Sequence, residues 1–95
     1  MPGYWIGMIS VTDPERFKGY TDRAPAAIAK FGGKMLSRGG QMVVLEGPAP
    51  AGRVAIIEFK DITTAKACYD SPEYQEAKRH RDGASTAQFF IVESV

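Results

Sequence analysis

Residues 4–11 read Tyr-Trp-Ile-Gly-Met-Ile-Ser-Val, and this stretch decides the fold prediction. Alternate residues of a β-strand point to opposite faces of its sheet. One face of this strand would carry Tyr4, Ile6 and Met8, and the other Trp5, Ile9 and Val11. Both faces are largely apolar, which predicts a strand that is covered on both sides.

The residues that follow this strand predict a helix that ends at the glycine pair 32–33. Asp13 can cap the free N–H groups of the first turn, and Pro14 suits the first helical position. Apolar residues then recur at helical spacing. Pro25 lies inside this pattern and lacks a backbone N–H, so we expect it to kink or divide the helix.

The rest of the pattern predicts three more strands and two more helices. A long strand over 34–46 is interrupted by Gly39-Gly40, a pair typical of a bulge or bend. The Pro- and Gly-rich segment 47–52 predicts a turn. The later elements are a strand over 53–59, a helix over 61–69, a short helix over 71–81 and a strand over 88–95.

This β-α-β-β-α-β order predicts an α+β fold of the ferredoxin-like kind, formed by one domain over residues 1–95. Its four-stranded antiparallel sheet carries helices on one face only. Yet the strands over 4–11, 53–59 and 88–95 are apolar on both faces. An exposed apolar sheet face usually marks an interface, so we expect a homodimer that packs through this face.

Composition excludes several classes of function. With 12 Lys+Arg against 11 Asp+Glu, the chain lacks the basic excess by which nucleic-acid binders neutralise phosphates. Cys68 is the only cysteine, which excludes an intrachain disulfide and favours a cytoplasmic location. Residues 1–6 have no basic segment and no long apolar run, so we expect neither a signal peptide nor a membrane span.

Short strings along the whole chain resemble a known family. They are Gly3-Tyr4-Trp5, Asp13-Pro14, Gly32-Gly33, Arg38-Gly39-Gly40, Glu46-Gly47, Ile57-Glu58-Phe59, Tyr69, Ser71-Pro72-Glu73-Tyr74-Gln75 and Ile91-Val92-Glu93. In this order they resemble the family called domain of unknown function 1330, in the dimeric α/β-barrel superfamily. The resemblance implies a ferredoxin-like subunit that dimerises through its sheet into a barrel.

The resemblance implies no particular reaction, because the superfamily hosts many. It includes small monooxygenases that work without a cofactor, haem-degrading enzymes, haem peroxidase-like enzymes and lactone isomerases. His80 departs from the family pattern, which has an aliphatic residue there.

Three polar residues of the predicted strands are candidates for chemistry. Arg38, beside a glycine bend, could present its donors to a carboxylate or phosphate, or could pair with Glu46 or Glu58 across the sheet. Each of these two glutamates ends an apolar strand. If buried, its carboxyl would have a raised pKa and could act as a general base; the alternative is a salt bridge with an arginine.

Aromatic residues are candidates for a ligand pocket. Trp5, Tyr20, Tyr69 and Tyr74 could surround a flat apolar molecule, although core packing is the commoner role of such residues. Tyr20 and Tyr69 could meet over the sheet. Their hydroxyls would then need partners, for which Arg38 and Arg81 are candidates.

His80 and Cys68 are the remaining candidates for reactive side chains. His80 could be a general base or a haem-iron ligand, but a surface position near a helix C-terminus is the stronger expectation. Cys68 could be a nucleophile, but we expect a small buried hydrophobe. No metal motif is present, and we expect no cofactor.

Three functions remain open. The first is an enzyme that acts on a small apolar organic molecule between sheet and helices, like a cofactor-free monooxygenase or an isomerase. The second is a non-catalytic ligand-binding or dimerisation module, and the third is haem binding through His80. The candidate catalytic residues are Arg38, Glu46, Tyr69 and Arg81, and the candidate ligand-binding residues are Trp5, Tyr20, Arg38, Tyr69 and Tyr74.

Overall fold

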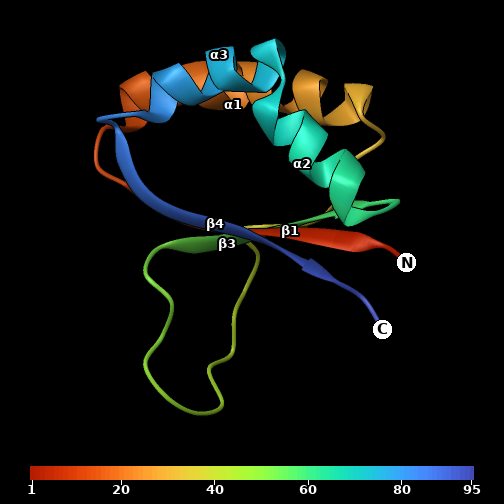
Figure 1. Ribbon diagram of the computed structural model, residues 1–95. Helices are drawn as coiled ribbons and strands as arrows, with labels where there is room; N and C mark the ends of the chain where they lie inside the picture. The colour runs from red at the N-terminus through yellow and green to blue at the C-terminus, as the bar shows by residue number, and fades with distance from the viewer.

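Four antiparallel strands form a sheet in the order β2-β3-β1-β4, and all helices lie on one face of it (Figure 1). The computed structural model describes residues 1–95. The elements are β1 (Gly3–Val11), α1 (Pro14–Lys30), β2 (Lys34–Arg38), β3 (Arg53–Phe59), α2 (Ile62–Asp70), α3 (Pro72–Arg81) and β4 (Ser85–Glu93). The predicted α+β, ferredoxin-like architecture is confirmed.

Each helix begins at a side-chain cap that is visible in the sequence. Asp13, Asp61 and Ser71 each accept a hydrogen bond from the backbone N–H three residues later, at 3.1, 2.7 and 3.2 Å. Such caps satisfy donors that the first turn of a helix leaves free. They explain why the predicted helix starts agree with the structure.

The first helix continues without a break across Pro25. The carbonyl that this proline cannot bond belongs to Thr21, an exposed residue, so water can reach it. On either side of Pro25, the buried side chains of Ala24 and Ile28 hold the helix against the core. Of the two predicted effects of Pro25, a kink or a division, the structure excludes the division.

β2 ends at Arg38, not at Glu46 as predicted, and residues 39–52 form a loop. Gly39 adopts a φ of +66°, a left-handed conformation that turns the chain out of the ladder. Its N–H makes a last bond to the Val54 carbonyl, at 3.0 Å. The apolar residues beyond it resemble a strand in composition but have no neighbouring strand to bond. The last strand, by contrast, begins earlier than predicted, at Ser85.

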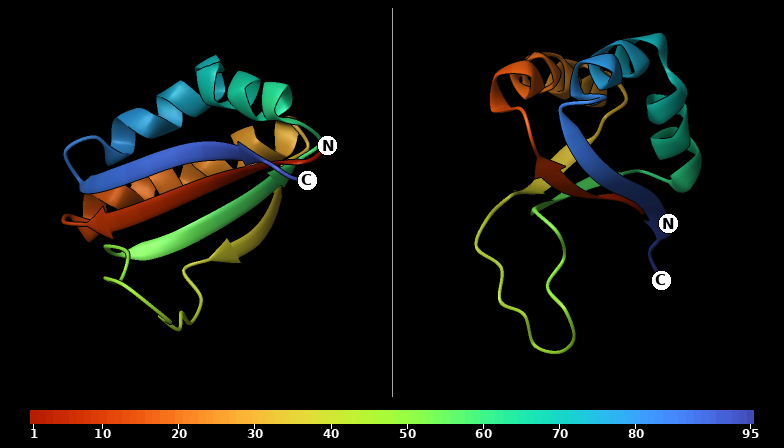
Figure 2. Two further views of the ribbon diagram at one scale, coloured as in Figure 1. Left: turned by 60° about the horizontal axis from the view of Figure 1, so that its bottom comes forward. Right: turned by 90° about the vertical axis from the view of Figure 1, so that its left-hand side faces the viewer.

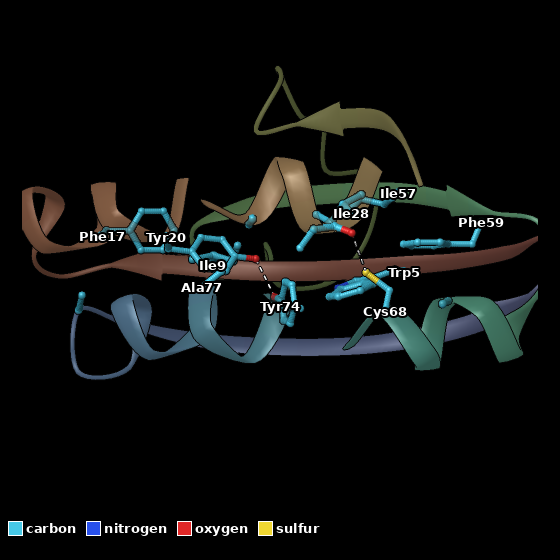
Figure 3. Packing of buried hydrophobic residues seen from close by; sticks show 14 residues of the cluster. Trp5, Ile9, Phe17, Tyr20, Ile28, Ile57, Phe59, Cys68, Tyr74 and Ala77 are labelled. Atoms are coloured by element: carbon cyan, nitrogen blue, oxygen red, sulfur yellow. Dashed lines mark hydrogen bonds between the residues drawn. The ribbon is translucent and has the colours of Figure 1, made fainter. Parts of the chain in front are cut away.

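The core lies between the helices and the sheet (Figure 3). Trp5 occupies its centre, stacked on Phe59 at 5.7 Å between ring centroids and edge-on to Tyr74 at 4.8 Å. Cys68 is fully buried, and its Sγ lies 3.8 Å from the carbonyl oxygen of Ala27. The prediction that Cys68 is a buried core residue is confirmed.

The opposite face of the sheet, called the outer face below, carries no helix (Figure 2). The loop over 39–52 projects on this side, and its Val43 and Leu45 are 74% and 89% exposed. Half-buried or exposed apolar side chains form the outer face: Tyr4, Ile6 and Met8 of β1, Val54 and Ile56 of β3, and Phe90 and Val92 of β4.

None of the helices has the length and apolarity needed to cross a membrane.

Candidate functional site

A largely apolar pocket, called the α1 pocket below, opens between α1 and the sheet. Its volume of about 100 Å³ is of the same order as the roughly 150 Å³ of an engineered cavity that binds benzene. Ring walls come from Phe17 and Tyr20 of α1 and from Phe89 of β4, and the floor includes Ile57 of β3. Strand alternation points Ile57 to the helix side, and helical spacing puts Phe17 and Tyr20 on one face.

Arg38 and Arg53 line the same pocket from the adjoining ends of β2 and β3. The Arg53 guanidinium lies 5.8 Å from the centroid of the Phe17 ring. Neither arginine forms a salt bridge, and no acidic residue lines the pocket. The polar groups at this end of the pocket are therefore cationic and free to meet an anion.

The alternative of an ion pair between Arg38 and a glutamate is wrong. Glu46 does not end a strand but lies exposed in the loop over 39–52, away from the α1 pocket. Glu58 faces the outer side, where it accepts a hydrogen bond from Tyr4 Oη at 3.2 Å. This bond raises the pKa of Tyr4. The structure therefore places neither carboxylate where it could act as a base on a pocket ligand.

A buried polar cluster lies behind the α1 pocket. The hydroxyl oxygens of Tyr20 and Tyr74 are 2.7 Å apart and share a hydrogen bond (Figure 3). Burial raises the pKa of both phenols, so both remain protonated at neutral pH. They can donate a hydrogen bond to an oxygen atom, but they cannot serve as bases.

Arg81 lies against this cluster and not in the pocket wall. Its guanidinium carbon is 4.4 Å from the centroid of Phe89 and 5.4 Å from that of Tyr20. The residue is only 6% exposed, its Nε has no hydrogen-bond partner, and no carboxylate pairs with it. Contact with two aromatic faces compensates part of the cost of burying this charge.

The remaining aromatic candidates belong elsewhere. Trp5 and Tyr69 line a separate groove of about 270 Å³ between α2 and β4, together with Lys66. Tyr69 does not meet Tyr20 as predicted; it packs on Trp5 and on Tyr74, at 5.8 and 5.4 Å between ring centroids. The five predicted ligand-binding residues thus divide between the α1 pocket, this groove and the core.

His80 and Cys68 lie outside the α1 pocket. His80 Nε2 is 3.6 Å from a carboxylate oxygen of Glu76, and the imidazole packs over Gly19 of α1. Burial raises the pKa of the Cys68 thiol to about 11, so it is not a thiolate at neutral pH. No three His, Cys, Asp or Glu side chains are grouped as metal ligands would be. Neither residue is placed to act on a ligand in the α1 pocket.

Sequence reasoning missed Arg53 and Phe89 as pocket residues. A signal for Arg53 was present, because it shares a strand face with Ala55 and Ile57, which also line the pocket. Phe89 could not be identified from the sequence, because its place in the pocket depends on a tertiary contact. A Cβ at Gly7, its partner on β1, would lie 2.4 Å from Phe89 Cε1, so only glycine there leaves room for this ring.

Comparison with known proteins places the chain in a family. The family model described as Domain of unknown function (DUF1330) matches residues 2–95. The chain belongs to this family. No curated protein matches the sequence.

Solved structures of the same fold come from several bacteria. A protein of unknown function from Rhodopseudomonas palustris has a TM-score of 0.77 at 18% identity, covering 99% of this chain and 82% of that one. SnoaB, a cofactor-independent oxygenase from Streptomyces nogalater, has a TM-score of 0.66 at 15% identity, covering 99% and 93%. A dimeric protein of unknown function and ferredoxin-like fold from Bacteroides fragilis gives 0.64 at 14%, covering 98% and 96%. At these identities the likeness shows the fold alone.

Proposed function

We propose that this protein binds a small, largely apolar organic molecule in the α1 pocket and acts on it as a cofactor-independent oxygenase or an isomerase. One observation carries the proposal: an apolar pocket between helix and sheet has two unpaired arginines as its charged groups. Pockets of this composition suit a ligand with an apolar body and few polar groups.

Both reaction classes agree with the groups at the pocket. An isomerase moves a proton from one atom of its substrate to another. A cofactor-independent oxygenase converts an activated CH2 group and O2 into a carbonyl and water, so dioxygen is both oxidant and oxygen source. The Tyr20–Tyr74 hydroxyl pair, beside Arg81, supports either class because it can donate a hydrogen bond to a ligand oxygen on which negative charge develops. The shared fold of SnoaB supports the second class.

A non-catalytic ligand-binding module is the second candidate. It is favoured by the lining of the α1 pocket, in which no histidine, carboxylate or thiol is present. Without such a group, the chain has no side chain there that could remove a proton at neutral pH. An enzyme built on this pocket would need a substrate that ionises readily by itself.

One experiment separates these functions. We would measure melting temperature, oxygen consumption and product formation with a panel of phenolic and enolic compounds. The pocket-filling variant Ala55→Leu should abolish the ligand effect, and the exposed helix variant Ala29→Leu should retain it. Turnover that is lost only in Ala55→Leu supports the enzyme, and binding without turnover supports the module. If Ala55→Leu leaves the ligand effects unchanged, the proposal that ligands bind in the α1 pocket is wrong.

We also propose that the protein is a homodimer that packs through its outer face. The apolar side chains of this face, together with exposed Val43 and Leu45 in the loop over 39–52, form the kind of uncovered apolar surface that usually marks an interface. The similar protein from Bacteroides fragilis is described as dimeric. A second copy would bury this apolar surface.

A further inference from the structure

We infer that the ligand of the α1 pocket carries a negatively charged oxygen group, and that Arg38 and Arg53 bind this group. The inference rests on the proposed function and names the chemical class of the ligand: an apolar body with one carboxylate, or with an acidic phenol or enol that ionises. Both arginines lie on the strands that form the pocket floor, at the end where β2 leaves the sheet.

The charge around the pocket is the first observation that favours an anionic ligand. No acidic residue lines the α1 pocket, and neither Arg38 nor Arg53 has a carboxylate within salt-bridge distance. Of the other ten Lys and Arg side chains, four have such partners: Lys30 pairs with Glu73, Lys66 with Asp70, Lys78 with Asp82, and Arg79 with Glu76. What distinguishes Arg38 and Arg53 is that both line one pocket that contains no acidic residue. The positive charge at the pocket is thus uncompensated by the protein itself.

The backbone at Gly39 is the second observation, because it brings the two arginines together. Gly39 passes so close to Arg53 that a Cβ at Gly39 would lie 3.2 Å from the Arg53 Cβ. The left-handed φ of Gly39, +66°, adds a second reason for glycine at this position. The bend therefore keeps Arg38 and Arg53 at one rim. The N–H of Gly39 already bonds to Val54, so the guanidinium groups must supply the donors.

The surroundings of the arginines make an anion the best ligand. A guanidinium presents a planar set of donors that suits a carboxylate, and such charge-assisted bonds are about twice as strong as neutral ones. Both arginines are exposed, and Arg53 lies over the Phe17 ring at 5.8 Å, so an anionic group would meet them at the solvent-facing rim while the apolar body of the ligand contacts the walls. A ligand that binds as its phenolate or enolate also removes the need for a general base, which the pocket lacks.

Matched ligands that differ only in charge test this inference. Benzoate and para-ethylbenzoate are compared with benzyl alcohol and para-ethylbenzyl alcohol by calorimetry and by melting-temperature shift, at low and high salt. We expect the carboxylates to bind about tenfold more tightly than the alcohols, and this preference to shrink at high salt. The double variant Arg38→Gln/Arg53→Gln should lose the preference and still bind the alcohols.

Arg23→Gln is the matched control, because Arg23 is an exposed arginine of α1 that does not line the pocket. It should bind every ligand as the wild type does. Equal binding of carboxylates and alcohols, or a preference that survives in the double variant, would overturn the inference while leaving the pocket intact. If no ligand of either kind binds, the proposed function fails together with it.

Discussion

The hydroxyl oxygens of Tyr20 and Tyr74 lie 2.7 Å apart in the core, where their hydrogen bond joins α1 to α3. The two residues are 8% and 0% exposed, so water cannot replace either partner. The bond therefore fixes the helix pair whose Tyr20 ring forms a wall of the α1 pocket.

Removal of either hydroxyl should lower the unfolding free energy, and removal of both should lower it by less than the sum of the two single losses. Tyr74→Phe leaves the buried Tyr20 hydroxyl unsatisfied, and we expect a loss of about 1–3 kcal/mol in unfolding free energy. Tyr20→Phe should have a similar effect. The double variant should lose less than the sum of the two, as measured by urea denaturation at constant chain concentration. Tyr69→Phe, at a half-buried tyrosine whose hydroxyl makes no hydrogen bond, is the control; additive losses would contradict the coupling.

The Cys68 thiol should make stability depend on alkaline pH. Its pKa is raised from 9.0 to about 11 in the folded chain, so the folded state holds the proton over a range in which the unfolded state releases it. Stability is then full below pH 9 and declines as the pH rises toward 11, by about 2–3 kcal/mol at most. Denaturation curves of the wild type and Cys68→Ala should converge across this range. Curves that stay parallel would exclude the effect.

The same burial predicts that Cys68 is chemically inert in the native protein. A thiol reagent at pH 8 should modify it only after denaturation, because the side chain is fully buried and protonated. Spectroscopic titration with and without denaturant measures this directly. Rapid modification of the native chain would show that α2 opens readily.

Gly7 should be intolerant of a side chain because of Phe89. A Cβ there would lie 2.4 Å from Phe89 Cε1, so Gly7→Ala must displace the ring that lines the α1 pocket. We expect destabilisation of about 1–3 kcal/mol, measured by urea denaturation, with partial rescue by Phe89→Leu. Gly40→Ala is the control, since its nearest neighbour is 3.9 Å away. Equal stability of Gly7→Ala and the wild type would contradict the close approach.

A charge on the outer face should separate the proposed homodimer. Ile56 is half-buried on this face and pairs with Ile6 of β1. In analytical ultracentrifugation at micromolar concentration, we expect a wild-type dimer and a monomeric Ile56→Asp variant, since a buried unpaired carboxylate opposes association. Ala29→Asp, on the exposed side of α1, should remain dimeric. A monomeric wild type would end the proposal.

The sequence predicts features that depend on neighbours along the chain, and it fails where distant segments decide. Asp61 and Ser71 mark the starts of their helices in the sequence, because a cap bonds to a backbone N–H within the first turn. The end of β2 depends on whether another strand lies beside Val43, which local composition does not reveal. Likewise, Tyr20 meets Tyr74 and not Tyr69 because of how the helices are placed over the sheet. The cytoplasmic location stays a prediction.

Alternation along β3 has an evolutionary consequence. Arg53, Ala55 and Ile57 line the α1 pocket, whereas the intervening Val54 and Ile56 lie on the outer face. The proposed ligand site and the proposed subunit contact therefore use alternate residues of the same strand, so a substitution in one set leaves the side chains of the other face in place. A lineage could exchange its ligand by substitutions at every second position of one short strand and keep its assembly unchanged.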